Sequence, residues 1–257
     1  MDSNRWTKEQ LKLAFYLYCQ LPFGRLHSKN IEIIKLATFI KRTPSAVAMK
    51  LVNFASLDPV IISSGRRGLG NASALDKDVW EEFHSDWEGL ATECAQLLQS
   101  FELVDSLEAT NANSVAEDFT GETRQVSVNQ RIKQSFFRRA VLSGYQGRCC
   151  MSGLSESSLL IASHIVPWSK DSANRLNPSN GLSLSAIHDK AFDRGLIALS
   201  DELEIILSGK MLRSEDDFIK SFFLPLKGKG IELPDRFAPS IVFVTRHRTE
   251  VFLGVGS

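Results

Sequence analysis

Two histidines and one asparagine follow each other in an order that could support chemistry. His164 comes sixteen residues before Asn180, and His188 follows eight residues after it. An imidazole changes its charge near neutral pH, so it can accept a proton from water or bind a metal ion. An asparagine amide can orient a neighbouring side chain by hydrogen bonding. The pattern therefore indicates an acid–base or metal site, and its structural alternative is a pair of satisfied core histidines.

Three elements must position these residues. Residues 159–161 are an apolar run that predicts a β-strand, and this strand ends at His164. Asn180 follows in a loop rich in turn-forming residues. His188 then lies in the first turns of a predicted helix, which Phe192 anchors in the core. The sequence predicts a strand, a loop and a helix in that order.

The histidines lie within two longer sequence strings. Residues 163–168 read Ser-His-Ile-Val-Pro-Trp, and residues 180–195 contain Asn-Gly-Leu followed by His-Asp-Lys-Ala-Phe-Asp-Arg-Gly. These strings resemble the HNH endonuclease family, and within it the subgroup of restriction-type nucleases with the same motifs. The resemblance covers about residues 130–205, and a weaker likeness continues to Phe252. It implies a metal-dependent DNA endonuclease whose C-terminal domain has the ββα-metal fold.

The resemblance gives a role to each of the three residues. His164 is implied to be the general base that takes a proton from the attacking water, which suits a ring that is neutral near pH 7. His188 is implied to be a ligand of the metal ion. Asn180 is implied to belong to the same catalytic set, where it braces the loop and orients His164 by hydrogen bonds.

The implied metal site departs from the wider family at one position. Ser163 precedes the base, where Asp or another strong ligand is common, and a serine hydroxyl is a weak ligand. The site could therefore use fewer protein groups, bind the ion more loosely, or recruit Asp193 or Asp189. Mg²⁺ is the expected ion, and Mn²⁺ or another divalent ion is the alternative.

The N-terminal part predicts two short helices with a tight break between them. The first covers about residues 31–39, and the second begins after Thr43, an N-cap residue that precedes Pro44. Such a pair is typical of a helix-turn-helix, whose second helix enters the major groove of DNA. The apolar residues expected to face the core are Val47, Leu51 and Phe54. The residues expected to contact DNA are Arg42, Ser45, Lys50 and Asn53.

A strand and a basic hairpin are expected after this helix pair. Residues 60–62 predict the strand, and the glycine-rich residues 63–70 predict a hairpin at the position of a wing, where Arg66 and Arg67 would contact phosphates. The sequence thus predicts a helical, winged-helix-like DNA-recognition domain. The alternative is a plain helical packing domain with a solvated basic loop. The candidates for DNA contact in the C-terminal part are Lys170 and Arg194.

The charge distribution divides the chain into three parts. Residues 1–90 hold 12 basic and 10 acidic residues, residues 91–125 hold one and seven, and residues 126–257 hold 17 and 13. The acidic middle part, including residues 121–123, indicates a linker that follows a helix predicted for about residues 79–103.

These divisions lead to a domain prediction of the α+β class. The predicted parts are a DNA-recognition domain at 1–92, an acidic helix end and linker at 93–125, and an HNH nuclease domain with a C-terminal extension at 126–257. Within that extension, residues 241–244 predict a strand.

The composition excludes several classes of protein. Thirty basic and thirty acidic residues give a formal net charge of zero, which excludes a uniformly basic nucleic-acid coat but leaves local basic faces. No apolar run reaches the roughly 18 residues that a membrane span needs, and the first residues do not read as a secretory signal. The four cysteines are too sparse for a disulfide framework or a zinc knuckle, so reduced thiols in a cytoplasmic protein are expected.

One main function hypothesis and two alternatives follow. The main hypothesis is a metal-dependent endonuclease that cuts double-stranded DNA in restriction or phage defence, and whose N-terminal domain recognises sequence or modified DNA. Cutting both strands with one site per chain favours a homodimer over a monomeric nickase. The first alternative is a DNA-binding regulator that carries a degenerate HNH fold. The second is an RNA-directed nuclease, although the sequence has no aromatic RNA-binding sheet motif.

Overall fold

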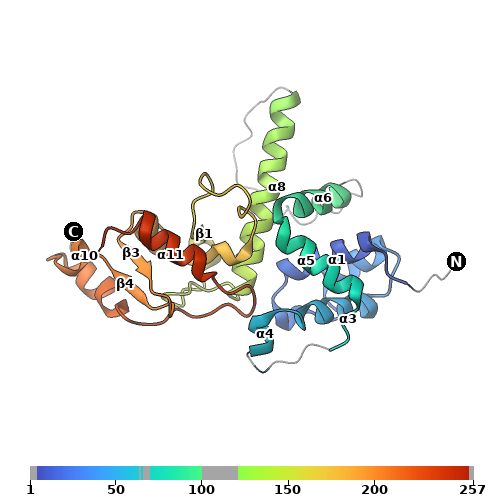
Figure 1. The fold of residues 1–257 in the computed structure, drawn as a ribbon, viewed down its shortest axis with the longest axis horizontal. Helices are drawn as coiled ribbons and strands as arrows, with labels where there is room; N and C mark the ends of the chain where they lie inside the picture. Colours follow the sequence, from blue (N-terminus) through green and yellow to red (C-terminus); the bar gives the residue numbers. More distant parts are fainter. Residues whose placement is uncertain (1–4, 64, 66–69, 100–120, 255–257) are drawn as a thin grey trace. The chain divides into compact units, whose positions relative to one another are not determined.

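The computed structural model describes residues 5–63, 65, 70–99 and 121–254 (Figure 1). The chain divides into two compact units, Met1–Ala140 and Val141–Ser257, called unit 1 and unit 2 below. In the residues described, unit 1 contains helices and no strand, whereas unit 2 combines short helices with two small sheets. The class is therefore α+β, as the sequence predicts. No helix in the described ranges has the length and apolar character needed to cross a membrane.

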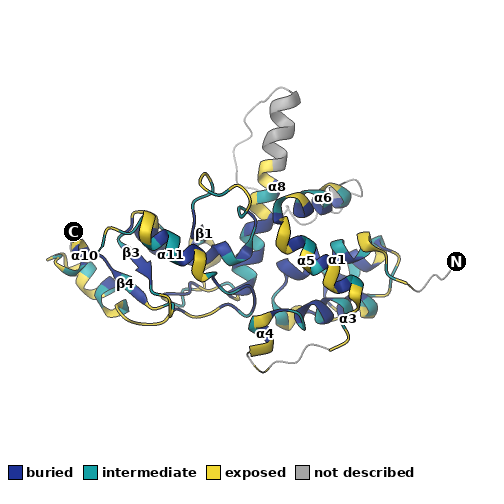
Figure 2. Cartoon of the chain, viewed as in Figure 1, coloured by how far each residue is buried: buried dark blue, intermediate teal, exposed yellow. Residues whose placement is uncertain are grey.

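Unit 1 is built from helices joined by short turns. These elements are α1 (Lys8–Gln20), the 3₁₀ turn η1 (Phe23–Arg25), α2 (Ile31–Phe39), α3 (Pro44–Ala55), α4 (Pro59–Ser63), α5 (Ala74–Ser85) and α6 (Trp87–Gln99). After residues 100–120, which lie outside the described part, α8 (Gly121–Gly144) crosses the boundary between the units. Helices α1, α3 and α5 pack against one another through buried sides (Figure 2).

Local caps fix where the helices of unit 1 begin. Thr7 and Gln10 form a capping box at the start of α1, in which the backbone amide of each donates to the side chain of the other at 3.2 Å. Thr43 caps α3 directly before Pro44, as the sequence predicts. The two-helix pattern is therefore confirmed over α2 and α3.

Aromatic side chains fill the core of unit 1. Phe15 of α1 is fully buried, and its ring centroid lies 5.0 Å from that of Phe54 on α3 and 4.7 Å from that of Phe83 on α5. Val47 and Leu51 are buried with Phe54, which confirms the predicted core face of α3. Burial of several large rings is the main source of stability for such a helical unit.

The expected strand after the helix pair is wrong. Residues 60–62 lie in the short helix α4, which begins at Pro59 and in which the Asp58 carboxylate accepts a hydrogen bond from the amide of Val60. Pro at the first helical position and an Asp before it favour a helix start over a strand. Of the hairpin predicted for residues 63–70, residue 63 ends α4, and residues 64 and 66–69 lie outside the described part. A winged helix is therefore not shown.

Two further expectations for the middle of the chain are also corrected. The helix predicted for residues 79–103 is broken at Asp86, where α5 ends and α6 begins, and residues 100–103 lie outside the described part. Residues 121–123 were expected in a linker but form the first turn of α8. The chain passes from unit 1 to unit 2 after Ala140.

The strand, loop and helix predicted around His164 are present in unit 2, and a second strand lies between the loop and the helix. β1 (Leu160–His164) pairs antiparallel with β2 (Gly181–Ser185), with His164 opposite Gly181 and Leu160 opposite Ser185. α9 (Ala186–Asp193) starts directly after β2 and packs on both strands. The loop between the strands contains the 3₁₀ turn η3 (Pro178–Asn180). The order of elements is therefore strand, strand, helix.

The second sheet and the last helix complete unit 2. β3 (Ile197–Leu199) pairs antiparallel with β4 (Ile205–Leu207), and α11 (Ile241–Glu250) packs against β3 (Figure 1). The expected strand at 241–244 is wrong, because these residues form the first turn of α11 instead. The remaining short elements are η2 (Ser157–Leu159), α10 (Gly209–Leu212), the π-helical turn η4 (Ile219–Phe223) and η5 (Leu224–Leu226).

Candidate functional site

His164 is held in one orientation at the end of β1. Its Nε2–H donates a hydrogen bond of 3.0 Å to the carbonyl oxygen of Arg175. The ring of Trp168 packs edge-on against it, with the two ring centroids 5.4 Å apart. A carbonyl oxygen can only accept, so in the neutral ring the proton lies on Nε2 and the lone pair lies on Nδ1. Burial lowers the pKa of His164, which keeps the ring neutral near pH 7.

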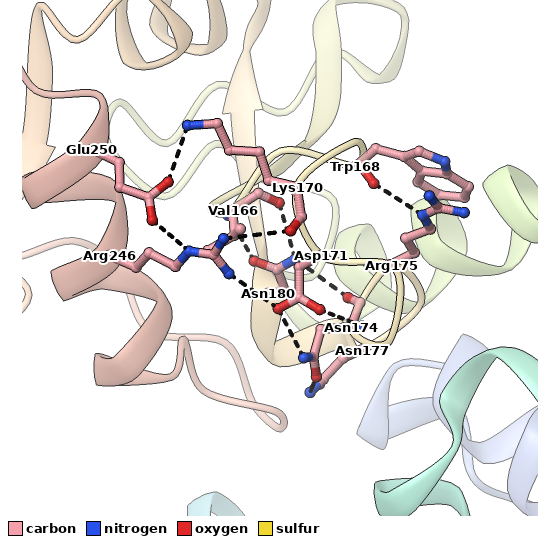
Figure 3. Close-up of polar contacts among 10 residues, drawn as sticks. All are labelled: Val166, Trp168, Lys170, Asp171, Asn174, Arg175, Asn177, Asn180, Arg246 and Glu250. Atoms are coloured by element: carbon pink, nitrogen blue, oxygen red, sulfur yellow. Dashed lines mark hydrogen bonds and ion pairs between the residues drawn. The ribbon is translucent and has the colours of Figure 1, made fainter.

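Asn180 ties together the two ends of the loop that precedes β2. Its side chain is fully buried, and Oδ1 accepts a hydrogen bond of 2.8 Å from the amide of Val166. Nδ2 donates to the carbonyl oxygens of Val166, at 3.2 Å, and of Asn174, at 3.3 Å (Figure 3). Since Asn174 directly precedes Arg175, these bonds also fix the carbonyl that accepts the hydrogen bond from His164. They are the kind of contact that a bracing role requires.

His188 lies inside unit 2 rather than on its surface. The side chain is 0% exposed, and Nδ1 lies 2.8 Å from Ser185 Oγ and 3.4 Å from Cys149 Sγ. The ring of Phe222 stacks on it at 5.1 Å, and that of Phe223 meets it edge-on at 5.7 Å. Within the described ranges its buried Nε2 has no hydrogen-bond partner.

The two weaker metal candidates lie in different environments. Ser163 is 3% exposed, and no hydrogen-bond partner for its hydroxyl lies among the described residues. Asp193 is exposed at the end of α9. Partial desolvation, and then the charge of Asp189, raise the pKa of Asp193. The structure therefore places one candidate inside the sheet and the other at the solvent surface.

The predicted ligands do not fit a metal centre as the structure arranges them. Among the residues described, no three His, Cys, Asp or Glu side chains lie close enough to hold one ion. His188 is enclosed by two phenylalanine rings, although an ion that works on a phosphate needs open coordination positions.

The predicted DNA contacts of unit 1 include two cations that have protein partners. Lys50 Nζ lies 2.9 Å from both carboxylate oxygens of Asp76, which is 0% exposed. The guanidinium of Arg42 donates to the Gln10 side chain at 3.2–3.3 Å and lies over the ring of Trp6. Both cations thus join α3 and the turn before it to neighbouring segments of unit 1.

The remaining predicted DNA contacts differ in exposure. Ser45 is exposed on the first turn of α3, whereas Asn53 is 5% exposed and donates to the carbonyl oxygen of Asn71 at 3.5 Å. The expectation that Asn53 faces outward is therefore wrong. Arg66 and Arg67 lie outside the described residues. In unit 2, Lys170 forms an ion pair of 3.0 Å with Glu250, and Arg194 is exposed.

Several contacts at the site have no signature in the sequence. The acceptor for His164 is a backbone carbonyl, which every residue possesses, so no residue type could reveal Arg175. Cys149 is fully buried against His188. Burial opposes its ionisation, but hydrogen bonds from His188, Ser152 and the backbone outweigh burial and lower the pKa of Cys149 to about 6.

Comparison with known proteins identifies the region that contains these residues. A family model described as HNH endonuclease matches residues 149–200. This segment includes β1, β2, α9 and β3, and with them His164, Asn180 and His188. A search of curated proteins finds no match for the chain. By the family match and by the order of strand, strand and helix, residues 149–200 are an HNH endonuclease domain.

Proposed function

We propose that this protein is an endonuclease that hydrolyses phosphodiester bonds in double-stranded DNA, with His164 as the general base. The observation that carries the proposal is the hydrogen bond from His164 Nε2 to the Arg175 carbonyl within a segment that matches the HNH endonuclease family. This bond orients the ring and selects the tautomer whose Nδ1 can accept a proton.

The proposed step is proton abstraction from water. His164 Nδ1 takes one proton from a water molecule, whose oxygen bonds to phosphorus while the bond to the leaving deoxyribose oxygen breaks. The leaving oxygen then takes a proton from solvent, and the imidazolium returns its proton to solvent. The lowered pKa of His164 favours the neutral ring that the first step requires.

We also propose that the reaction depends on a divalent cation, Mg²⁺ or Mn²⁺, because HNH nucleases typically use one. The site geometry assigns no ligand set for that ion, and a cleavage assay with and without the ion tests the dependence. Cleavage is expected with Mg²⁺ or Mn²⁺ and not with EDTA. Equal cleavage in EDTA would contradict this part of the proposal.

The decisive experiment compares two histidine variants on supercoiled plasmid DNA. His164→Ala is expected to lower the cleavage rate by about 10²- to 10⁴-fold, the usual contribution of a general base. His27→Ala is the matched control, because His27 is exposed on unit 1 and is expected to have no role in cleavage. Circular dichroism confirms that both variants are folded. Full activity of His164→Ala would overturn the proposal.

The biological role and the assembly extend this proposal. We propose a restriction or phage-defence enzyme in which unit 1 recognises a sequence or a DNA modification, and in which two copies act together on the two strands. Incubation with modified and unmodified phage DNA, followed by sequencing of the ends, tests recognition and strand stagger together. Light scattering on the protein bound to a cleaved duplex tests the homodimer, and a monomer on that duplex would contradict it.

A second candidate function is a DNA-binding regulator with a degenerate HNH domain. The enclosed ring of His188 and the lack of a ligand cluster in the described residues favour it. Calorimetry with Mn²⁺ and a gel-shift assay decide between the two functions. Specific DNA binding without metal uptake and without cleavage would support the regulator.

A further inference from the structure

We propose that Arg246, on the C-terminal helix α11, is a positioning residue that holds His164 in its productive orientation through the loop between β1 and β2. This inference rests on the proposed function of His164. α11 lies outside residues 149–200, so the HNH match itself gives Arg246 no role. The inference depends on a continuous series of polar contacts within unit 2.

The first part of this series connects α11 to the loop. Arg246 Nη2 donates to the carbonyl oxygen of Lys170 at 3.4 Å, and Nη1 lies 3.5 Å from Asp171 Oδ2. The same guanidinium donates from Nε to Glu250 Oε1 at 2.8 Å. Glu250 in turn pairs with Lys170 at 3.0 Å (Figure 3). Helix α11 therefore contacts the loop at the main-chain carbonyl of Lys170 and at the side chains of Lys170 and Asp171.

The second part connects Asp171 to Arg175, whose carbonyl oxygen accepts the hydrogen bond from His164. The Asp171 carboxylate accepts hydrogen bonds from the amide of Asn174 at 3.2 Å and from its Nδ2 at 3.0 Å. The carbonyl of Asn174 accepts from Asn180, and the carbonyl of the next residue, Arg175, accepts from His164. Figure 3 shows Asp171 and Asn174 in the same turn of the loop. Asp171 thus lies four residues before Arg175 and is connected to it through the hydrogen bonds with Asn174.

The third part is the firm attachment of α11 to the rest of unit 2. His247 Nε2 donates to the carbonyl oxygen of Phe192 at 3.1 Å, and the two rings stack with centroids 3.7 Å apart. Arg248 donates to the carbonyl oxygen of Leu199 at 2.8 Å and to Asp201 at 2.7 Å. Since α11 is fixed on both α9 and β3, Arg246 can act as a rigid support for the loop.

The alternative is that Arg246 contributes only surface ion pairs. Exposed pairs of this kind stabilise a protein only weakly, and their loss would leave the rate unchanged. A positioning role predicts a different outcome, because small displacements of a catalytic group can lower a rate by about 10²-fold. A direct phosphate contact predicts a third outcome, in which KM rises and kcat stays constant.

The experiment compares Arg246→Ala, Arg246→Lys and the control Lys220→Ala, which removes another ion pair of unit 2. Arg246→Ala is expected to lower kcat for plasmid cleavage about 10- to 100-fold with KM within about twofold of wild type. Arg246→Lys is expected to recover part of the loss, and Lys220→Ala is expected to change neither parameter. A rise in KM alone, or an unchanged kcat, would overturn the positioning role.

A measurement that needs no activity separates this inference from the proposed function. Nitrogen-15 spectra of wild type are expected to show His164 as the Nε2–H tautomer, and Arg246→Ala is expected to give a mixture of tautomers. Hydrogen exchange of residues 170–175 is expected to become about tenfold faster in that variant. If wild type does not cleave DNA but these changes occur, the nuclease proposal fails alone. If wild type cleaves and the tautomer and exchange rates are unchanged by Arg246→Ala, the positioning inference fails alone.

Discussion

The two units use their polar side chains in opposite ways. In unit 1, Lys50 and Arg42, which were expected to contact DNA, bind Asp76 and Gln10 within the unit. In unit 2, the contacts of Asp171, Asn174 and Asn180 hold the loop between β1 and β2, and the Arg175 carbonyl of that loop accepts the hydrogen bond from His164. The comparison shows that the position of a charged residue in the sequence does not decide whether its charge is available to bind DNA. The nearest partner in the folded unit decides it.

The difference also separates stability from chemistry. Asp76 is fully buried with a cation beside it, so this contact mainly holds α3 and α5 together. Asn180 is equally buried, but its bonds set the conformation of a loop next to the proposed base. Removal of the first should affect the folding of unit 1, and removal of the second should affect both folding and rate in unit 2.

The largest effect is expected for Asn180→Ala. The change removes three hydrogen bonds and leaves the buried amide of Val166 without its acceptor, so unit 2 should lose about 3 kcal/mol of stability. The cleavage rate should fall by about 10²-fold or more because the loop is no longer fixed. Denaturant titration and plasmid cleavage measure the two effects. Ser179→Ala, which keeps the backbone contact to Ser240, is the control. A variant with normal activity would break the proposed contrast between the units.

Asp76→Ala is expected to have the next largest effect, and only in unit 1. The variant leaves Lys50 without its partner and removes the side chain that accepts from the Ser73 amide, which should cost about 3 kcal/mol. Urea unfolding followed by the fluorescence of the buried Trp87 reports on this unit. Asp78→Ala on the exposed side of α5 is the matched control and should change stability by less than about 0.5 kcal/mol. Equal effects of the two variants would show that the buried Lys50–Asp76 pair contributes no more to stability than an exposed carboxylate does.

A stability effect of similar size, but one that appears only at low pH, is expected from His247. Burial lowers the pKa of His247 to about 4, from an ordinary value of 6.5, although its bond to Phe192 opposes the shift. The contribution of neutral His247 to the free energy of unfolding is therefore complete above pH 6.5 and declines as the pH falls toward 4. In this range the ring binds a proton in the unfolded chain but not in the folded protein. The decline should amount to about 3 kcal/mol.

The His247→Gln variant tests this contribution. Its unfolding free energy should depend less on pH between 6.5 and 4 than that of wild type, since glutamine does not titrate. Hydrogen exchange of residues 241–250 at several pH values provides the measurement. An identical pH dependence in the two proteins would show that other groups control the acid sensitivity of unit 2.

The smallest effect is expected for DNA affinity at α3. If this helix contacts DNA, Ser45→Glu should weaken binding at low salt by about three- to tenfold, because it adds a negative charge beside the phosphates. Lys50→Gln should change affinity less, since Asp76 already neutralises the cation. Ser85→Glu at the end of α5 controls for the added charge alone. If Lys50→Gln is the more harmful variant, the assignment of Lys50 to internal packing is wrong.

Local sequence patterns predicted a large part of the fold correctly. The start of α3 after Thr43, the strand that ends at His164 and the helix that contains His188 all follow from neighbouring residues. The same approach failed for residues 60–62 and 241–244, where short runs of β-branched residues suggested strands. The helix α4 begins at Pro59 after Asp58, and α11 packs against β3. A run of three or four apolar residues does not by itself distinguish a helix from a strand.

The sequence by itself indicated the likeness of residues 149–200 to HNH endonucleases and singled out His164 as the candidate base, because an ordered string of motif residues is independent of how the chain packs. Only the tertiary structure decided the environment of each side chain. It enclosed His188 between Phe222 and Phe223, and it brought Arg246 within reach of a loop about 75 residues earlier in the chain. The physical reason is that exposure, hydrogen bonding and pKa depend on contacts between distant segments, and no local pattern encodes those contacts.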